Sequence, residues 1–178
     1  MDMTTKNAPP LQLVAPFLEA TKDEAPALAE QIAALDDRGQ RQLAGVLGRF
    51  GGGARHELHA GDRVLARRLL APLRHVDADA LETLNKILDY LDLDANGRLD
   101  EDEMTRCAEA IEHFARLVPP AHQVSRAELE TLRRVLRALD ANDDHRLDAK
   151  ERDAFFEGVR DPEALVARLE ADGRLTRA

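Results

Sequence analysis

Apolar residues recur with a helical period along most of the chain, and the second half repeats one spacing twice. The two matching sets are Leu84, Ile87, Leu88 and Leu91, and then Leu132, Val135, Leu136 and Leu139. Apolar residues at i, i+3, i+4 and i+7 share one face of an α-helix. The pattern therefore predicts two amphipathic helices, and the constant offset of 48 residues indicates an internal repeat.

Polar residues near these two helices indicate where each of them starts. Asp79–Glu82 and Ser125–Glu128 have the spacing of capping boxes, which open helices. A further helix is predicted after the polar loop of each unit. Its apolar positions are Met104, Cys107, Ala108, Ile111 and Phe114 in the first unit, and Phe155, Phe156 and Val159 in the second.

The first half is predicted to form several shorter helices. A weak helix over about 11–20 is interrupted by Pro16, and Thr21–Glu24 resembles a capping box for a helix to about Leu35. Another helix ends at Phe50, before the flexible "GGGA" of 51–54. A basic amphipathic helix over about 60–74 can bind membranes or fill the groove of a calcium sensor. Packing against its neighbours as a partly solvated helix is the interpretation we favour.

The composition supports an all-α fold, because Leu, Ala, Arg and Glu are abundant and only 3% of residues are aromatic. The single cysteine, Cys107, excludes an internal disulfide and a cysteine metal cluster, and we interpret it as a small core residue. Neither a signal peptide nor a membrane span is recognisable, so we expect a soluble, cytoplasmic protein. The excess of Arg over Lys is typical of GC-rich bacterial genomes.

The net charge of −9 is concentrated in two windows of twelve residues. Residues 92–103, "DLDANGRLDEDE", carry −5, and residues 140–151, "DANDDHRLDAKE", carry −3. This distribution argues against nucleic-acid binding and predicts cation sites.

The order of residues in both windows suits Ca²⁺, a hard cation that takes six to eight oxygen ligands. Gly97 stands at position 6 of loop one, where the turn favours a residue that tolerates positive φ. A glutamate at position 12 of each loop can give both carboxylate oxygens, which suits Mg²⁺ poorly. The expected ligands are Asp92, Asp94, Asn96, the Arg98 carbonyl, Asp100 and Glu103 in loop one, and Asp140, Asn142, Asp144, the Arg146 carbonyl, Asp148 and Glu151 in loop two.

The two units resemble EF-hands, the helix–loop–helix calcium sites, over roughly 79–117 and 126–159. The resemblance implies an EF-hand pair joined by a short antiparallel β contact between 98–100 and 146–148, with Leu99 opposite Leu147. There is also a weaker similarity to calerythrin-like and sarcoplasmic calcium-binding proteins. These usually carry four EF-hands, whereas the N-terminal half here shows no recognisable loop.

Two residues of loop two depart from the family pattern. His145 replaces Gly at position 6, and a left-handed conformation costs a non-Gly residue roughly 1–2 kcal/mol. We therefore expect loop two to bind Ca²⁺ more weakly than it would with Gly. Arg152 stands at position 13, where the exit helix normally buries an apolar side chain.

The sequence predicts three regions: an N-terminal helical region (1–75), an EF-hand pair (76–160) and a C-terminal helix and tail (161–178), with Gly173 ending the last helix. A calcium sensor or adaptor is the first functional hypothesis. Its apolar groove would take a protein partner or an internal helix, such as about 63–74 or 162–171. A calcium buffer or a calcium-stabilised structural protein is the alternative. An enzyme is not expected, because no nucleophile–base set is recognisable, and the His56/His59 pair lacks HExxH spacing.

Overall fold

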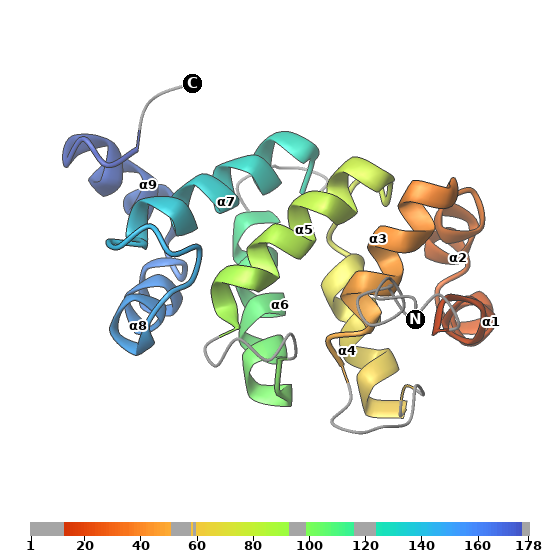
Figure 1. Cartoon of the computed structure of the whole chain (residues 1–178). Helices are drawn as coiled ribbons and strands as arrows, with labels where there is room; N and C mark the ends of the chain where they lie inside the picture. The colour runs from red at the N-terminus through yellow and green to blue at the C-terminus, as the bar shows by residue number, and fades with distance from the viewer. Residues whose placement is uncertain (1–12, 51–57, 59, 93–98, 116–123, 176–178) are drawn as a thin grey trace, which may run out of the picture.

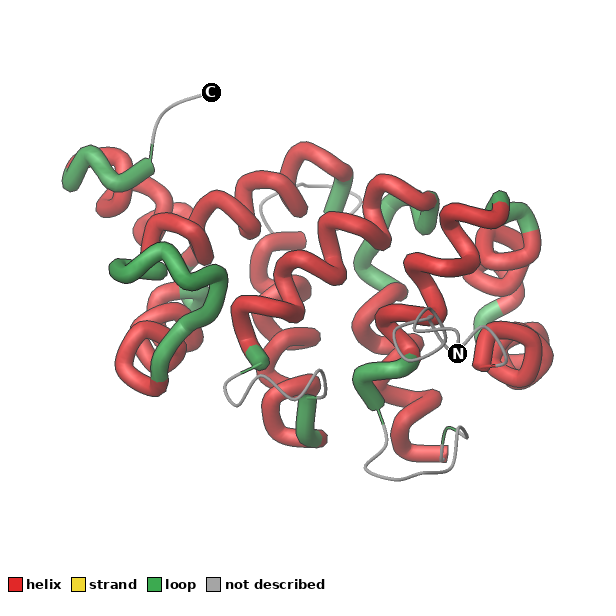
Figure 2. The backbone as a smooth tube through the Cα atoms, in the orientation of Figure 1, coloured by secondary structure: helices red, strands yellow, loops and turns green. Residues whose placement is uncertain are grey.

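The computed structural model describes residues 13–50, 58, 60–92, 99–115 and 124–175, and all regular structure in these ranges is α-helical (Figures 1 and 2). The predicted all-α class is confirmed. The helices are α1 (Val14–Glu24), α2 (Pro26–Ala33), α3 (Asp37–Leu47), α4 (Ala60–Leu70), α5 (Ala78–Leu91), α6 (Glu101–Ala115), α7 (Arg126–Leu139), α8 (Ala149–Gly158) and α9 (Pro162–Ala171).

The helices form an elongated array of two layers. Helix α5 lies between α3 and α7 in one layer, and α4 lies beside α6 in the other (Figure 1). Helices α1 and α2 cover one end of the array, and α9 packs against α7 and α8 at the other. One cluster of buried apolar side chains runs from Leu13 to Leu175, so the hydrophobic core is continuous from the first helix to beyond the last.

Helices α3 and α4 are a third pair of successive helices, or unit, with the same sequence register as the other two. The apolar set Leu43, Val46, Leu47 and Phe50 has the spacing found in α5 and α7, and all four residues are buried. In every unit the second helix starts ten residues after the last apolar residue of the set. Those pairs are Phe50 and Ala60, Leu91 and Glu101, and Leu139 and Ala149.

The three units are joined head to tail by equivalent backbone hydrogen bonds. The Leu99 N–H donates to the Arg49 carbonyl (3.1 Å), and the Leu147 N–H donates to the Tyr90 carbonyl (2.9 Å). Each leucine is at loop position 8, and each acceptor lies two residues before the loop of the preceding unit. The predicted β contact between Leu99 and Leu147 is therefore wrong. A reciprocal contact needs two-fold symmetry, whereas successive units here repeat by translation, as in a solenoid.

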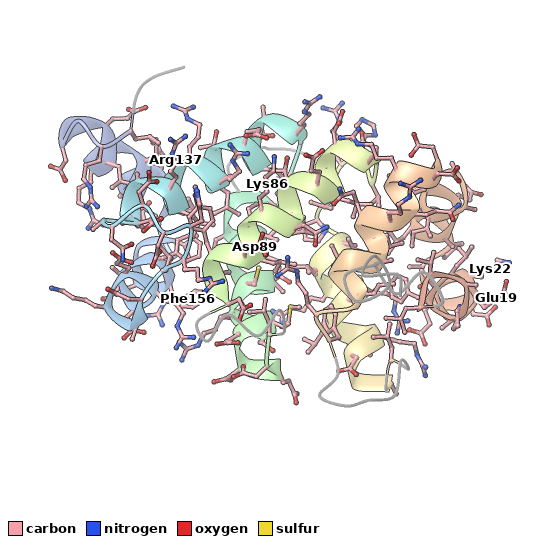
Figure 3. The ribbon with its side chains drawn as sticks, viewed as in Figure 1. Glu19, Lys22, Lys86, Asp89, Arg137 and Phe156 are labelled. Carbon is pink, nitrogen blue, oxygen red and sulfur yellow. The ribbon has the colours of Figure 1, made fainter. Side chains whose placement is uncertain are left out.

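Polar side chains strengthen the contact between the first two units. The amide Nδ2 of Asn85 on α5 donates to the Gln42 carbonyl of α3 at 2.9 Å. Arg49 donates to the Asn85 carbonyl at 3.2 Å and to Asp89 at 2.6 Å. Asp89 is labelled on α5 in Figure 3. These bonds fix α5 beside α3 while the apolar faces of both helices stay in the core.

The predicted helix starts are correct in one case and wrong in two. Ser125 and Glu128 form the expected capping box at α7. Helix α5 instead starts two residues before its predicted box, because Asp77 is the N-cap and accepts from the Ala80 N–H at 2.8 Å. Thr21 lies inside α1, where its hydroxyl donates to the Phe17 carbonyl at 2.7 Å, so no helix starts there.

Two further expectations concern Pro16 and the end of the chain. Pro16 does not interrupt α1, because it occupies the first turn, where backbone N–H groups have no intrahelical acceptor. Gly173 ends α9 as predicted, with φ of 71°. The Arg174 N–H donates to the Leu169 carbonyl, and the Gly173 N–H donates to the Glu170 carbonyl, which is the Schellman arrangement.

Candidate metal centre

Loop two connects α7 to α8, and all of its residues are described. Asp140 caps the C-terminus of α7, and Asp148 is the N-cap of α8. Between them the chain turns through two left-handed residues, Asp143 (φ 56°) and His145 (φ 64°). The conformation expected at position 6 is therefore confirmed for His145. The turn directs the His145 N–H back toward the start of the loop.

Asp140 is the buried acidic residue of this loop, with 6% of its surface exposed. Its Oδ2 accepts a hydrogen bond from the His145 N–H at 2.9 Å. Its Oδ1 is buried and has no hydrogen-bond partner among the described residues. A buried carboxylate oxygen without a partner is costly, and a cation compensates that cost.

Glu151 links the end of the loop to its beginning. Its Oε2 accepts from the Asp148 N–H at 3.0 Å, while the Asp148 side chain accepts from the Glu151 N–H at 2.8 Å. The second oxygen, Oε1, accepts from the Ala141 N–H at 3.0 Å. Both carboxylate oxygens of Glu151 are thus turned toward the loop, as a bidentate ligand at position 12 requires.

Asn142 and Asp144 continue the series of oxygen donors. The Asp144 carboxylate accepts from the Arg146 N–H at 3.0 Å and from the Asn142 amide at 3.2 Å. The Asn142 Oδ1 accepts from the Asp144 N–H at 3.4 Å. The side chains of Asp140, Asn142, Asp144, Asp148 and Glu151 are therefore all engaged within this short loop. Their oxygen-only chemistry fits Ca²⁺, and the partnerless Asp140 Oδ1 gives an inward-facing position for it.

Loop one can be compared with loop two only at its ends. Its expected ligands Asp94, Asn96 and Arg98 lie outside the described residues. Asp92 is buried, like Asp140. Asp100 and Glu103 form the same reciprocal pair of backbone hydrogen bonds as Asp148 and Glu151, at 3.1 and 2.7 Å. The two loops therefore share the conformation of their last turn.

Glu103 has an additional partner from the neighbouring unit. Its Oε1 accepts from Nη1 of Arg152 at 2.8 Å, and the two side chains are only 16% and 19% exposed. Burial raises the pKa of Glu103, although the hydrogen bond from the Asp100 N–H and the Arg152 guanidinium both act to lower it. Arg152, at position 13 of loop two, thus holds the glutamate at position 12 of loop one.

The faces of α6 and α8 beyond this ion pair enclose a groove of about 410 Å³. The Arg106 guanidinium lies 5.4 Å from the centre of the Phe156 ring, so a cation–π contact closes one part of it. Phe156, predicted as an apolar face residue, is only partly buried here (Figure 3), in contrast to fully buried Phe155. The rest of the groove is lined by three acidic residues, Glu109, Asp153 and Glu157, and by Ala110, His113, Val159 and Arg160.

In loop two, Asp143 and His145 lie close to Asp140, although neither is among the side-chain ligands that the sequence predicts. Ligand atoms of Asp140, Asp143 and His145 all lie within 4.8 Å of one another. Asp143 is at loop position 4, and the sequence draws attention to His145 only for its backbone conformation. Their approach depends on the two left-handed residues, which the spacing of acids alone does not reveal.

Comparison of the chain with protein-family models, with characterised proteins and with solved structures finds no match. The functional assignment therefore depends on the loops themselves.

Proposed function

We propose that this protein binds Ca²⁺ through two EF-hand-type loops, 92–103 and 140–151. The observation that carries the proposal is the arrangement in loop two. A buried Asp140 oxygen has no hydrogen-bond partner in the described part of the chain, and both oxygens of Glu151 are turned toward the loop. Loop one is included because its last turn is equivalent and its sequence supplies an oxygen ligand at every expected position.

The proposed role is that of a sensor, because metal binding at loop one competes with a contact between units. If Glu103 gives both oxygens to Ca²⁺, Oε1 shares its lone pairs between the metal and Arg152, which weakens the contact with Arg152. Release of Arg152 frees α8 from α6 at the edge of the 410 Å³ groove. The groove would then widen and offer Phe156 and Val159 to a protein partner.

The alternative is a buffer or a structural calcium protein, and the burial pattern favours it. Val64 is the one large apolar side chain that is markedly exposed among the described residues. Helix α4 already lies against α6, where Arg68 pairs with Glu112 at 2.8 Å, and α9 covers α7 and α8. Internal helices thus occupy surfaces that a partner would need. In this alternative Ca²⁺ stabilises the array without exposing apolar surface.

Calorimetric titration with Ca²⁺ tests the binding proposal. Chelator-stripped wild-type protein should bind two equivalents, and Glu103→Gln and Glu151→Gln should each lose one, because the neutral amide cannot act as a bidentate anionic ligand. Glu157→Gln, an exposed acid of α8 outside both loops, is the matched control and should retain both equivalents. Absence of Ca²⁺ uptake at millimolar concentration would reject the proposal.

Binding of a hydrophobic dye separates the sensor from the alternative. A sensor should bind more dye when Ca²⁺ is added, and Glu103→Gln should suppress the increase because Arg152 is then not displaced. A buffer should show unchanged dye binding with a higher melting temperature, since a ligand at 100 times its Kd stabilises the folded state by about 2.7 kcal/mol.

A further inference from the structure

Loop two contains a second group of side chains able to bind a metal, in addition to the expected calcium ligands. The set combines an imidazole nitrogen of His145 with carboxylate oxygens of Asp140 and Asp143, all within 4.8 Å of one another. Two ligands of a tetrahedral Zn²⁺ ion at about 2.0–2.1 Å are about 3.4 Å apart. The exposed side chains of Asp143 and His145 need only small rotations to reach this spacing.

Asp140 distinguishes this set from a chance group of surface acids. The residue is only 6% exposed, and its Oδ1 has no hydrogen-bond partner among the described residues. Its Oδ2 is fixed by the His145 N–H at 2.9 Å, so the carboxylate cannot turn freely to find another donor. The remaining oxygen therefore offers a preorganised position for a cation.

The ring of His145 is oriented by the neighbouring unit. It meets the Tyr90 ring edge to face, with ring centres 6.3 Å apart and an interplanar angle of 74°. The Tyr90 carbonyl also accepts from the Leu147 N–H, which fixes loop two against the end of α5. Contacts with α5 thus keep the imidazole near Asp140.

We propose that loop two also binds a borderline transition-metal ion, with Zn²⁺ as the representative, through His145, Asp140 and Asp143. Imidazole is a good ligand for Zn²⁺ and related ions, whereas Ca²⁺ takes oxygen ligands. Because Asp140 belongs to both sets, Zn²⁺ and Ca²⁺ exclude each other from this loop. The side chains of His145 and Asp143 are outside the calcium set, so the inference does not depend on the calcium proposal.

The test uses Zn²⁺ titration of the full chain, stripped with chelator and carrying Glu103→Gln to silence loop one. His145→Asn and Asp143→Asn should each weaken one Zn²⁺ equivalent at least tenfold. Asn tolerates the left-handed conformation of both positions, so the turn should be preserved. Co²⁺ provides a second readout, because its visible absorption should change in His145→Asn when the imidazole ligand is lost.

Ca²⁺ titration of the same variants separates the two ion sites. Asp143→Asn should keep Ca²⁺ binding at loop two while its Zn²⁺ binding is at least tenfold weaker, whereas Glu151→Gln should lose Ca²⁺ binding at loop two and keep Zn²⁺ binding. Zn²⁺ affinity and stoichiometry that are unchanged in His145→Asn would overturn the inference, as would absence of a Zn²⁺ equivalent in the parent protein. If the protein takes up Ca²⁺ normally but does not bind Zn²⁺, only this inference is rejected. If it binds Zn²⁺ through His145 but takes up no Ca²⁺, only the calcium proposal is rejected.

Discussion

Replacement of Arg152 by Leu removes the cation that holds Glu103, the glutamate at position 12 of loop one. The Arg152 Nη1 to Glu103 Oε1 distance is 2.8 Å, and both side chains are largely buried. Ca²⁺ must draw that oxygen toward itself, so the contact opposes binding. Arg152→Leu should therefore raise the Ca²⁺ affinity of loop one.

The size of the effect depends on the contact that metal binding disrupts. A hydrogen bond between charged groups contributes about 1.5–3 kcal/mol to stability. Glu103 keeps part of its interaction with Arg152 if only one lone pair turns to the metal, so we expect a gain of about 1–2 kcal/mol, or roughly 5- to 30-fold in affinity. The metal-free variant should meanwhile lose about 1–3 kcal/mol of unfolding free energy, because Glu103 then lacks its partner.

Calorimetry in a Glu151→Gln background measures loop one alone, and urea unfolding without metal measures stability. The matched control is Arg160→Leu, which removes an exposed arginine just beyond α8. It should change the affinity of loop one less than twofold. Unchanged or weaker Ca²⁺ binding in a folded Arg152→Leu protein would refute the idea that Arg152 competes with the metal.

Three further predictions concern loop two, the core and the contact between units. His145 is left-handed in the folded loop, so His145→Gly removes a backbone strain that the fold itself imposes. The substitution should stabilise the protein by about 0.5–1 kcal/mol in urea unfolding without metal, and it should raise Ca²⁺ affinity at loop two less than fivefold. A larger gain in affinity would contradict this explanation. Burial raises the pKa of Cys107 to about 12, so above its unfolded value of about 8.5 the folded thiol stays neutral while the unfolded thiol ionises. The contribution of Cys107 to the free energy of unfolding should therefore fall by about 1.4 kcal/mol per pH unit above a pH of about 8.5. Cys107→Ala has no thiol, so the unfolding free energy of wild type minus that of Cys107→Ala should fall with the same slope. Arg49→Met should lower the free energy of unfolding in urea by about 1–3 kcal/mol, because the Asn85 carbonyl and Asp89 lose their hydrogen-bond donor. The control, Arg41→Met, replaces an exposed arginine on α3 and should change the free energy of unfolding by less than about 0.5 kcal/mol.

The third helix pair is visible in the apolar spacing at Leu43–Phe50, which matches the other two sets. It is inconspicuous because positions 1, 3, 5 and 9 of the corresponding segment, 51–62, are Gly51, Gly53, Arg55 and His59, and only position 12, Asp62, carries a carboxylate as in the two acidic windows. Conversely, the capping-box pattern at Thr21 misleads, because a Thr hydroxyl can equally donate to the carbonyl one turn earlier inside a helix. Local side-chain patterns therefore locate the helices better than they locate the helix ends.

The sequence by itself determined the helical class, the apolar face of each helix and the order of oxygen donors in the two acidic loops, because these depend on residues near one another in the chain. Only the tertiary structure decided how the units are joined, since Leu99 and Leu147 are equally able to pair with each other or with the preceding unit. It also placed Arg152 on Glu103 and brought His145 and Asp143 toward Asp140. Such contacts depend on how helices stack and where left-handed residues turn the backbone, and neither is encoded in spacing alone.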